Sequence, residues 1–168
     1  KHVRSNFNET AFFYPHLCTN ERGEIVFSFT LPQSLTRWNI YGFAHTKEML
    51  TGVLKASAYT SKEFMLQPNM PRYIRVGDKS CIAASVANLT TKEVKGEVTF
   101  VLFDPFTDKT LMTLKKPFEV KPEERAILDF NFEVTDEYDL LGVKIVADGG
   151  NFSDGEQHLL PVLSNTMY

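Results

Sequence analysis

The sequence predicts an all-β fold in which an antiparallel β-sandwich is preceded by part of a second sandwich. Short runs of alternating apolar and polar residues recur along the chain, and turn-forming pairs such as Asp104-Pro105 lie between them. No long stretch places apolar residues at the spacing of a helix. Strands punctuated in this way are typical of immunoglobulin- and fibronectin-like sandwiches.

The first part of the chain, residues 1–62, contains too few strands for a complete sandwich. Residues 25–31 alternate in polarity, residues 53–60 are also strand-like, and at most one helical turn is expected at residues 45–50. About three or four strands do not cover both faces of a sheet. We therefore expect an incomplete domain, which ends where two closely spaced prolines mark an edge or connecting segment.

The second part, residues 63–168, contains enough strands for one complete sandwich. Residues 126–134 place apolar side chains on one face, whereas residues 98–103 are apolar on both faces and are predicted to lie between two layers. Further strands are expected at residues 82–87, 110–114, 141–147 and 159–163. A span of about 100 residues with about seven strands is the size of one sandwich.

Composition supports a folded protein and excludes a nucleic-acid-binding surface. Hydrophobic residues make up 43% of the chain, including 14 Phe, 6 Tyr and 1 Trp, which is enough to fill a core. The 18 basic and 21 acidic residues are scattered, so positive charge is nowhere concentrated. Cys18 and Cys81 lie far apart; Cys81 is expected to be a small buried thiol, and a single disulfide remains open.

No group of residues in the sequence supports catalysis or cofactor binding. Glycine-rich phosphate loops and nucleophile motifs are absent, and the glycines lie in predicted turns. The acidic residues 136–139, and the group Asp148, Asn151 and Asp154, lack the spacing of a calcium loop and are predicted to lie in turns. The histidines are interpreted as surface or turn residues: His2, His16, His45 and His158. We expect no catalytic, cofactor-binding or metal-binding residue, and no enzyme.

Exposed aromatic rings suggest a second class of function. Rings at residues 12–15 and at Trp38 would suit stacking on sugars, as in a carbohydrate- or surface-binding module of an adhesin or glycan-processing protein. Burial in a core or between domains is the preferred interpretation. Because the first sandwich is incomplete, we also expect Phe12, Phe13, Phe27 and Phe29 to leave an apolar patch that packs on the second domain or on another copy of the chain.

Three sequences match the acceptor pattern for N-glycosylation, beginning at Asn8, Asn88 and Asn151. A chain this rich in Asn, Ser and Thr produces such matches by chance, which is the interpretation we favour. The chain has neither an initiator Met nor an apolar signal-peptide core at its start, so we expect an excised or processed piece of a longer protein.

Two stretches of the sequence resemble the alpha-2-macroglobulin family. Residues 3–14 resemble its Arg-x-x-Phe-x-Glu-Thr-aromatic pattern, and residues 29–38 resemble a strand that ends in Leu-Pro-x-x-Leu-Thr with a Trp soon after. Residues 71–78 are similar to the entry into the next macroglobulin-like domain, and residues 154–162 to the exit of bacterial members. The matching family-motif residues are Arg4, Phe7, Glu9, Thr10, Pro32, Thr36, Trp38, Arg75 and Gly77.

The resemblance implies that the parent is a bacterial broad-spectrum protease inhibitor. In this family a bait segment interrupts one macroglobulin-like domain, and residues 1–62 would be the C-terminal part of that domain, with a complete macroglobulin-like sandwich at residues 63–168. The family's Cys-Gly-x-Gln thioester motif is absent from this chain. The chain would then be structural framework that contacts neighbouring domains, and proteases only through the full-length protein, with self-association through the incomplete part. The resemblance places the parent outside the cytoplasm, in the bacterial periplasm or cell envelope, with a lipid anchor as one option.

The motif residues are suited to structural roles. Pro32 is predicted to end the strand at residues 25–31, because proline cannot donate a hydrogen bond to a ladder, and Trp38 is predicted to begin the next strand with a large buried ring. Arg4 and Glu9 are expected to pair across a turn, which in solvent is worth about 0–1 kcal/mol.

Overall fold

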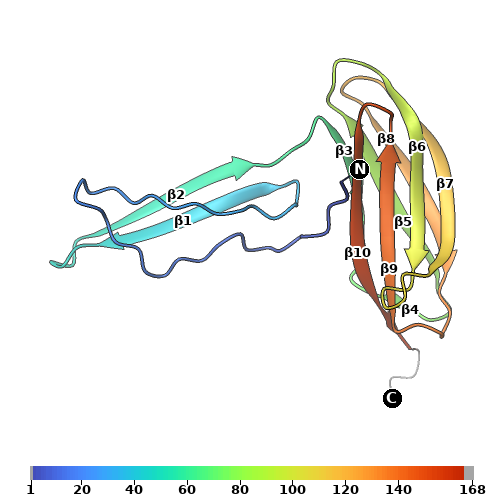
Figure 1. The fold of residues 1–168 in the computed structure, drawn as a ribbon, viewed down its shortest axis with the longest axis horizontal. Coiled ribbons are helices and arrows are strands. Elements are labelled where there is room, and N and C mark those ends of the chain that lie inside the picture. The colour runs from blue at the N-terminus through green and yellow to red at the C-terminus, as the bar shows by residue number, and fades with distance from the viewer. Residues whose placement is uncertain (1, 165–168) are drawn as a thin grey trace. The chain divides into compact units, whose positions relative to one another are not determined.

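The computed structural model describes residues 2–164, which form ten β-strands and no helix (Figure 1). The all-β prediction is confirmed. No helix in this range is long and apolar enough to cross a membrane. The chain divides into two compact units. Unit 2 is Asn6–Ser61, and the described part of unit 1 is residues 2–5 together with residues 62–164. The predicted first part, residues 1–62, includes residues 2–5, which contact the strands of unit 1.

Unit 1 is a sandwich of two sheets. The smaller sheet is antiparallel in the order β3-β5-β8, with β3 at Phe64–Pro68, β5 at Lys79–Asn88 and β8 at Arg125–Glu133. The larger sheet has the order β4-β10-β9-β6-β7, in which only the short β4 is parallel to its neighbour. Its strands are β4 Ile74–Arg75, β10 Ser153–Leu163, β9 Leu140–Asp148, β6 Val94–Phe103 and β7 Thr110–Val120.

The core of unit 1 lies between these two sheets. On β8 the predicted alternation is present, because Phe130 and Phe132 point inward and are buried. The ring of Phe100 on β6 stacks on Phe130, with 5.2 Å between centroids and 9° between planes. Aromatic stacking of this kind adds to the hydrophobic contribution of burying both rings.

Strand β6 is buried on one face only. Val98, Phe100 and Leu102 are buried in the core, whereas the alternate residues Val101 and Phe103 are only half-buried on the outer face of the sheet. The sequence predicted that both faces of this strand are covered. Only the inward face is buried, so that prediction is wrong for the outer face.

Cys81 is exposed, so the prediction of a buried thiol is wrong. The side chains of β5 alternate, and Ile82 and Ala84 take the inward positions. Cys81 lies one residue out of phase with them and points outward, because successive side chains on a strand face opposite sides. Cys18 is also exposed.

Unit 2 contains one antiparallel hairpin, β1 at Arg37–His45 and β2 at Thr51–Tyr59. The five residues between the strands form a β-hairpin turn rather than the helical turn that the sequence suggested. The Thr46 N–H donates to the Leu50 carbonyl at 2.9 Å, and Met49 has a φ of 65°.

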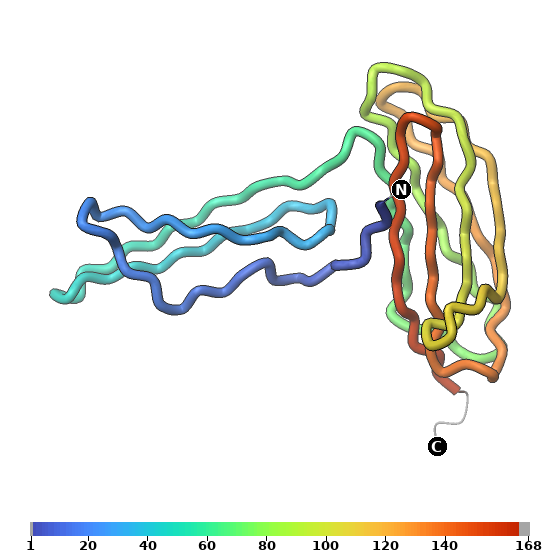
Figure 2. Tube along the Cα trace, viewed as in Figure 1, coloured from blue at the N-terminus to red at the C-terminus, as the bar shows by residue number. Residues whose placement is uncertain are grey.

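Residues 25–31 do not form a strand, so this prediction is wrong. They belong to a long excursion that turns at Asn20–Glu24, where the Asn20 N–H donates to the Glu24 carbonyl at 2.9 Å. The two ends of this segment are joined by a hydrogen bond from the Gln33 N–H to the Asn6 carbonyl at 2.7 Å. Figure 2 shows the segment in blue. Alternating polarity indicates two faces, but a strand also needs a hydrogen-bonded partner strand.

Candidate functional site

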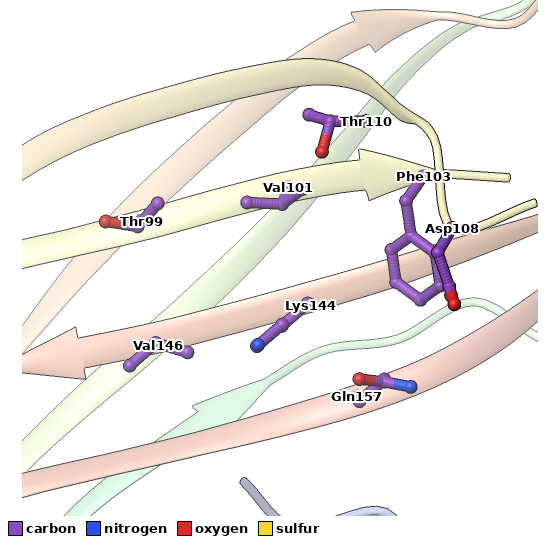
Figure 3. A pocket seen from close by; sticks show the side chains of 8 residues that line it. All are labelled: Thr99, Val101, Phe103, Asp108, Thr110, Lys144, Val146 and Gln157. Atoms are coloured by element: carbon purple, nitrogen blue, oxygen red, sulfur yellow. The ribbon is translucent and has the colours of Figure 1, made fainter. Parts of the chain in front are cut away.

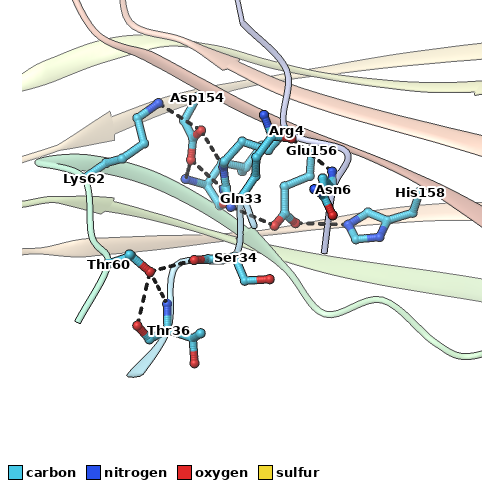
Figure 4. A network of polar contacts seen from close by, with 11 residues as sticks. Arg4, Asn6, Gln33, Ser34, Thr36, Thr60, Lys62, Asp154, Glu156 and His158 are labelled. Carbon is cyan, nitrogen blue, oxygen red and sulfur yellow. Dashed lines mark hydrogen bonds and ion pairs between the residues drawn. The ribbon is translucent and has the colours of Figure 1, made fainter. Parts of the chain in front are cut away.

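Arg4 lies in a buried acidic cluster on β10, which the dashed lines in Figure 4 trace. Its guanidinium makes a two-pronged contact with Asp154, with Nε 3.0 Å from Oδ1 and Nη2 2.8 Å from Oδ2. Nη1 lies 3.1 Å from Glu156 Oε1, and Nη2 also donates to the Leu66 carbonyl at 2.9 Å. Because the Arg4 and Asp154 side chains are 6% and 0% exposed, this ion pair is shielded from water.

Asp154 is the most heavily bonded carboxylate of the cluster. Besides Arg4, it accepts the Leu66 backbone N–H at 2.8 Å and the Lys62 ammonium at 3.1 Å. Burial by itself raises the pKa of Asp154, but the hydrogen bonds from Arg4, Leu66 and Lys62 outweigh burial and hold the pKa below its ordinary value. Asp154 is therefore ionised at neutral pH.

The cluster continues outward to His158. The Nε2 atom of His158 lies 3.2 Å from Glu156 Oε2, and the His158 side chain is partly exposed. Alternate residues of β10 thus present Asp154, Glu156 and His158 in one row, as the period of a strand requires.

This cluster differs from the sequence-based predictions in two respects. The expected pairing of Arg4 with Glu9 is wrong, because Arg4 bonds to Asp154 and Glu156 while Glu9 is exposed. Asp154 was interpreted as a turn residue, yet it is buried within β10. Arg4 and Asp154 are 150 positions apart, and no local pattern reports such a contact.

A second polar network, in unit 2, surrounds the Thr60 hydroxyl (Figure 4). Thr60 Oγ1 donates to the Ser34 carbonyl at 2.7 Å and accepts the indole N–H of Trp38 at 3.1 Å. The Thr36 backbone N–H also donates to this oxygen at 3.2 Å. Two motif residues, Thr36 and Trp38, therefore meet at one hydroxyl that no sequence pattern had singled out.

The other motif residues of unit 2 are not gathered around that hydroxyl. Pro32 is buried and Phe7 is half-buried, whereas Thr10 is exposed like Glu9. Trp38 is buried near the start of β1, as predicted.

The motif residues between β3 and β5 of unit 1 form a tight turn. Gly77 has a φ of 82°, a conformation that favours glycine, and its N–H donates to the Val134 carbonyl at 2.9 Å. Arg75 is exposed and its guanidinium lies 5.8 Å from the centre of the Tyr73 ring.

Aromatic rings cluster on the long excursion of unit 2. Phe12 lies 4.2 Å from Phe29 and 5.2 Å from Phe27 between ring centroids, and Tyr14 stacks at 5.4 Å from Phe12. Phe13 is 81% exposed. Three of the four phenylalanines of the predicted patch therefore contact one another, and the prediction that a partner covers them stays a prediction.

Asn88, at the end of β5, is fully buried. Its amide donates to the carbonyls of Lys92 and Val120 at 2.8 and 2.9 Å, and its oxygen accepts both the N–H and the hydroxyl of Thr90. A side chain in this position is inaccessible to glycosylation in the folded state. Asn8 and Asn151 are exposed.

A shallow hollow lies on the outer face of the five-stranded sheet of unit 1 (Figure 3). Its floor is made by outward-facing residues of β6 and β9 with Gln157 of β10, and its lining mixes apolar, hydroxyl and charged groups. The lining residues are Thr99, Val101, Phe103, Asp108, Thr110, Lys144, Val146 and Gln157. Asp108 is its only carboxylate, so the hollow has no pair of carboxylates for acid–base catalysis.

The chemistry that these groups support is binding and positioning. The described residues contain no group of three or more metal-ligating side chains placed to hold an ion. The buried charges of unit 1 are bonded to one another, which fixes chain segments in place.

Comparison with known proteins identifies the fold first. Trypsin-activated alpha-2-macroglobulin from Escherichia coli matches 86% of this chain and 10% of its own, with a TM-score of 0.70 and 19% identity. The same organism's alpha-2-macroglobulin activated by porcine elastase matches 96% of this chain and 15% of its own, with a TM-score of 0.67 and 16% identity. The fold is therefore that of macroglobulin-like β-sandwich domains.

The sequence then identifies the family. Residues 10–100, more than half of the chain, match the sequence model of the alpha-2-macroglobulin family. Alpha-2-macroglobulin of Thermotoga maritima is 30% identical over 100 residues, which are 60% of this chain and 6% of that protein. An alpha-2-macroglobulin homolog of a Nostoc species is 27% identical over 119 residues, 66% of this chain and 6% of its own length. The chain belongs to the alpha-2-macroglobulin family, and it spans about 6% of the length of these bacterial relatives.

Proposed function

We propose that the chain is a structural framework segment of a bacterial alpha-2-macroglobulin-like broad-spectrum protease inhibitor. Endopeptidase inhibitor activity would belong to the full-length parent. The main support is the match to Escherichia coli alpha-2-macroglobulin over 86% of this chain with a TM-score of 0.70. The bonding of the buried charges to one another agrees with a framework role, because a framework needs fixed geometry rather than a reactive group.

The two parts of the chain have different proposed roles. Residues 1–62 are the C-terminal part of an incomplete macroglobulin-like domain, and residues 63–168 are a complete one. The single hairpin of unit 2 supports the first assignment, since two strands alone are marginally stable. The eight strands of unit 1, packed around one core, support the second.

The family-motif residues are proposed to shape the framework. Arg4 and Trp38 do so through the polar contacts described above, and Gly77 through its turn. Exposed Glu9 and Thr10 lack such contacts and are proposed to face neighbouring domains of the parent. Proteases would be contacted only by the full-length protein, and the exposed aromatic surface of unit 2 would allow self-association.

The proposed location follows from the family. The likeness to bacterial alpha-2-macroglobulins supports a place outside the cytoplasm, so we place the parent in the bacterial periplasm or cell envelope, with a lipid anchor as one option. Fractionation of cells that produce the tagged full-length protein tests this directly. Recovery in the cytoplasmic fraction would contradict it.

An inhibition assay tests the framework role. The full-length parent and the 168-residue chain are each incubated with trypsin or elastase, and cleavage of a large protein substrate is measured. The parent should slow this cleavage, and the isolated chain should not at any molar ratio. Inhibition by the isolated chain, or its absence in the parent, would refute the proposal. A glycan array on the same chain tests the carbohydrate-binding alternative.

A further inference from the structure

Arg4 makes a short backbone contact with β10 of unit 1. Arg4 forms an isolated parallel bridge with Glu156. The Arg4 N–H donates to the Gly155 carbonyl at 2.9 Å, and the Gln157 N–H donates to the Arg4 carbonyl at 2.8 Å. One bridged residue is far below the length at which a strand holds itself in place. Side-chain contacts are therefore expected to add to this bridge in keeping Arg4 on β10.

The Arg4 side chain supplies that hold. Its guanidinium enters a recess whose walls are the carboxylates of Asp154 and Glu156 and whose base is the Leu66 carbonyl (Figure 4). Each of its three nitrogens has a bonded oxygen within 3.1 Å. Planar, two-pronged recognition of a carboxylate is a property of arginine that lysine lacks. The recess is therefore built for a guanidinium.

The carboxylate of Asp154 also binds Lys62, the first residue after unit 2. Unit 2 begins at Asn6 and ends at Ser61, so Arg4 and Lys62 flank the two places where the chain passes between the units. Lys62 Nζ lies 3.1 Å from Asp154 Oδ1, and its side chain is 41% exposed. The arm from Arg4 is buried and the arm from Lys62 is open to solvent.

From this arrangement we propose that the recess on β10 is a guanidinium-binding site, and that residues 3–5 occupy it as a strap. Asp154 fastens both connections to unit 2 onto one strand of unit 1. The Arg4–Asp154 ion pair is the stronger of the two contacts, because it is buried and two-pronged. The partly exposed Lys62–Asp154 ion pair is the weaker one. Loss of the guanidinium contact releases the strap while the sandwich stays folded.

Hydrogen exchange of single backbone amides in the full chain tests this. The Gln157 amide, bonded to Arg4, reports on the strap, and the amides of β6 report on the sandwich. Asp154→Asn and Arg4→Lys should each speed exchange at Gln157 by about ten- to a hundredfold, because they weaken a charge-assisted hydrogen bond. In the original chain and in Arg4→Lys alike, Gln157 should exchange faster than the β6 amides, because the strap opens without unfolding of the sandwich.

Arg125→Lys is the matched control, since Arg125 is an exposed arginine of unit 1. It should leave the Gln157 amide as slow as in the original chain. If Asp154→Asn unfolds the sandwich, Arg4→Lys decides the question. Unchanged protection of Gln157 in Arg4→Lys would overturn the proposal. Exchange at Gln157 as slow as in β6 would also overturn it, because residues 3–5 would then leave β10 only when the whole sandwich unfolds.

Discussion

Replacing Asn88 with alanine tests whether a buried asparagine holds one corner of unit 1 together. Its amide group bonds to the carbonyls of Lys92 and Val120, and its oxygen bonds to Thr90 twice. Alanine removes all four hydrogen bonds. The Lys92 carbonyl keeps the Thr90 hydroxyl as a donor at 2.9 Å, so the groups that lose most are the Val120 carbonyl and the Thr90 N–H.

The expected cost follows from those two groups. A buried polar group left without its partner costs about 1–3 kcal/mol, and two of them give about 2–6 kcal/mol. Because single domains are stable by only about 5–15 kcal/mol, such a loss is large enough to measure with confidence in a denaturation curve.

Urea unfolding followed by far-UV circular dichroism measures this loss. Tryptophan fluorescence is unsuitable, because the only tryptophan, Trp38, lies in unit 2. Asn131→Ala is the control, since Asn131 is exposed on β8, and its free energy of unfolding should stay within about 0.5 kcal/mol of the original. If Asn88→Ala behaves like this control, the hydrogen-bond reasoning is wrong.

Three further predictions concern other parts of unit 1, with one control in unit 2. Because the folded-state pKa of Asp154 is lowered, its contribution to stability is present above its unfolded pKa of about 3.9 and is lost as pH falls through the folded value. Chemical denaturation should show stability falling below about pH 4, less steeply in Asp154→Asn; equal slopes would contradict this. Gly96→Ala should destabilise by at least about 2 kcal/mol, because a Cβ would lie 1.8 Å from the Asp148 carbonyl oxygen, whereas Gly52→Ala has open space and should be near neutral in the same assay. In a Cys18→Ser variant, Cys81 should react with an aromatic disulfide reagent without unfolding, and a rate limited by unfolding would show that the thiol is buried.

The sandwich of unit 1 could be predicted because its signal is local. Each strand buries one face, so the polarity of residues 126–134 predicts both the strand and the inward positions of Phe130 and Phe132. Cys81 shows the limit of that reasoning. Its run is apolar on both faces, and composition alone does not say which residues take the inward phase.

The strand expected at residues 25–31 failed for a different reason. Its alternation is as regular as that of β8, and Phe27 and Phe29 do contact the same ring, that of Phe12. A strand, however, is defined by hydrogen bonds to a neighbour, and in unit 2 the regular pairing is confined to β1 and β2. The alternating polarity correctly indicated that Phe27 and Phe29 lie on the same side. It did not predict a strand, because residues 25–31 have no hydrogen-bonded partner strand.

The Arg4 cluster explains why the family motif at residues 3–14 was recognisable but its internal pairing was not. Arg4 belongs to unit 1, whereas Phe7, Glu9 and Thr10 belong to unit 2. The motif therefore crosses the point where the chain leaves one unit for the other, and its members take their contacts within different units. Sequence proximity favoured a pair between Arg4 and Glu9. Burial favoured Asp154, because a guanidinium taken out of water needs a carboxylate that is buried with it, and exposed Glu9 does not meet that requirement.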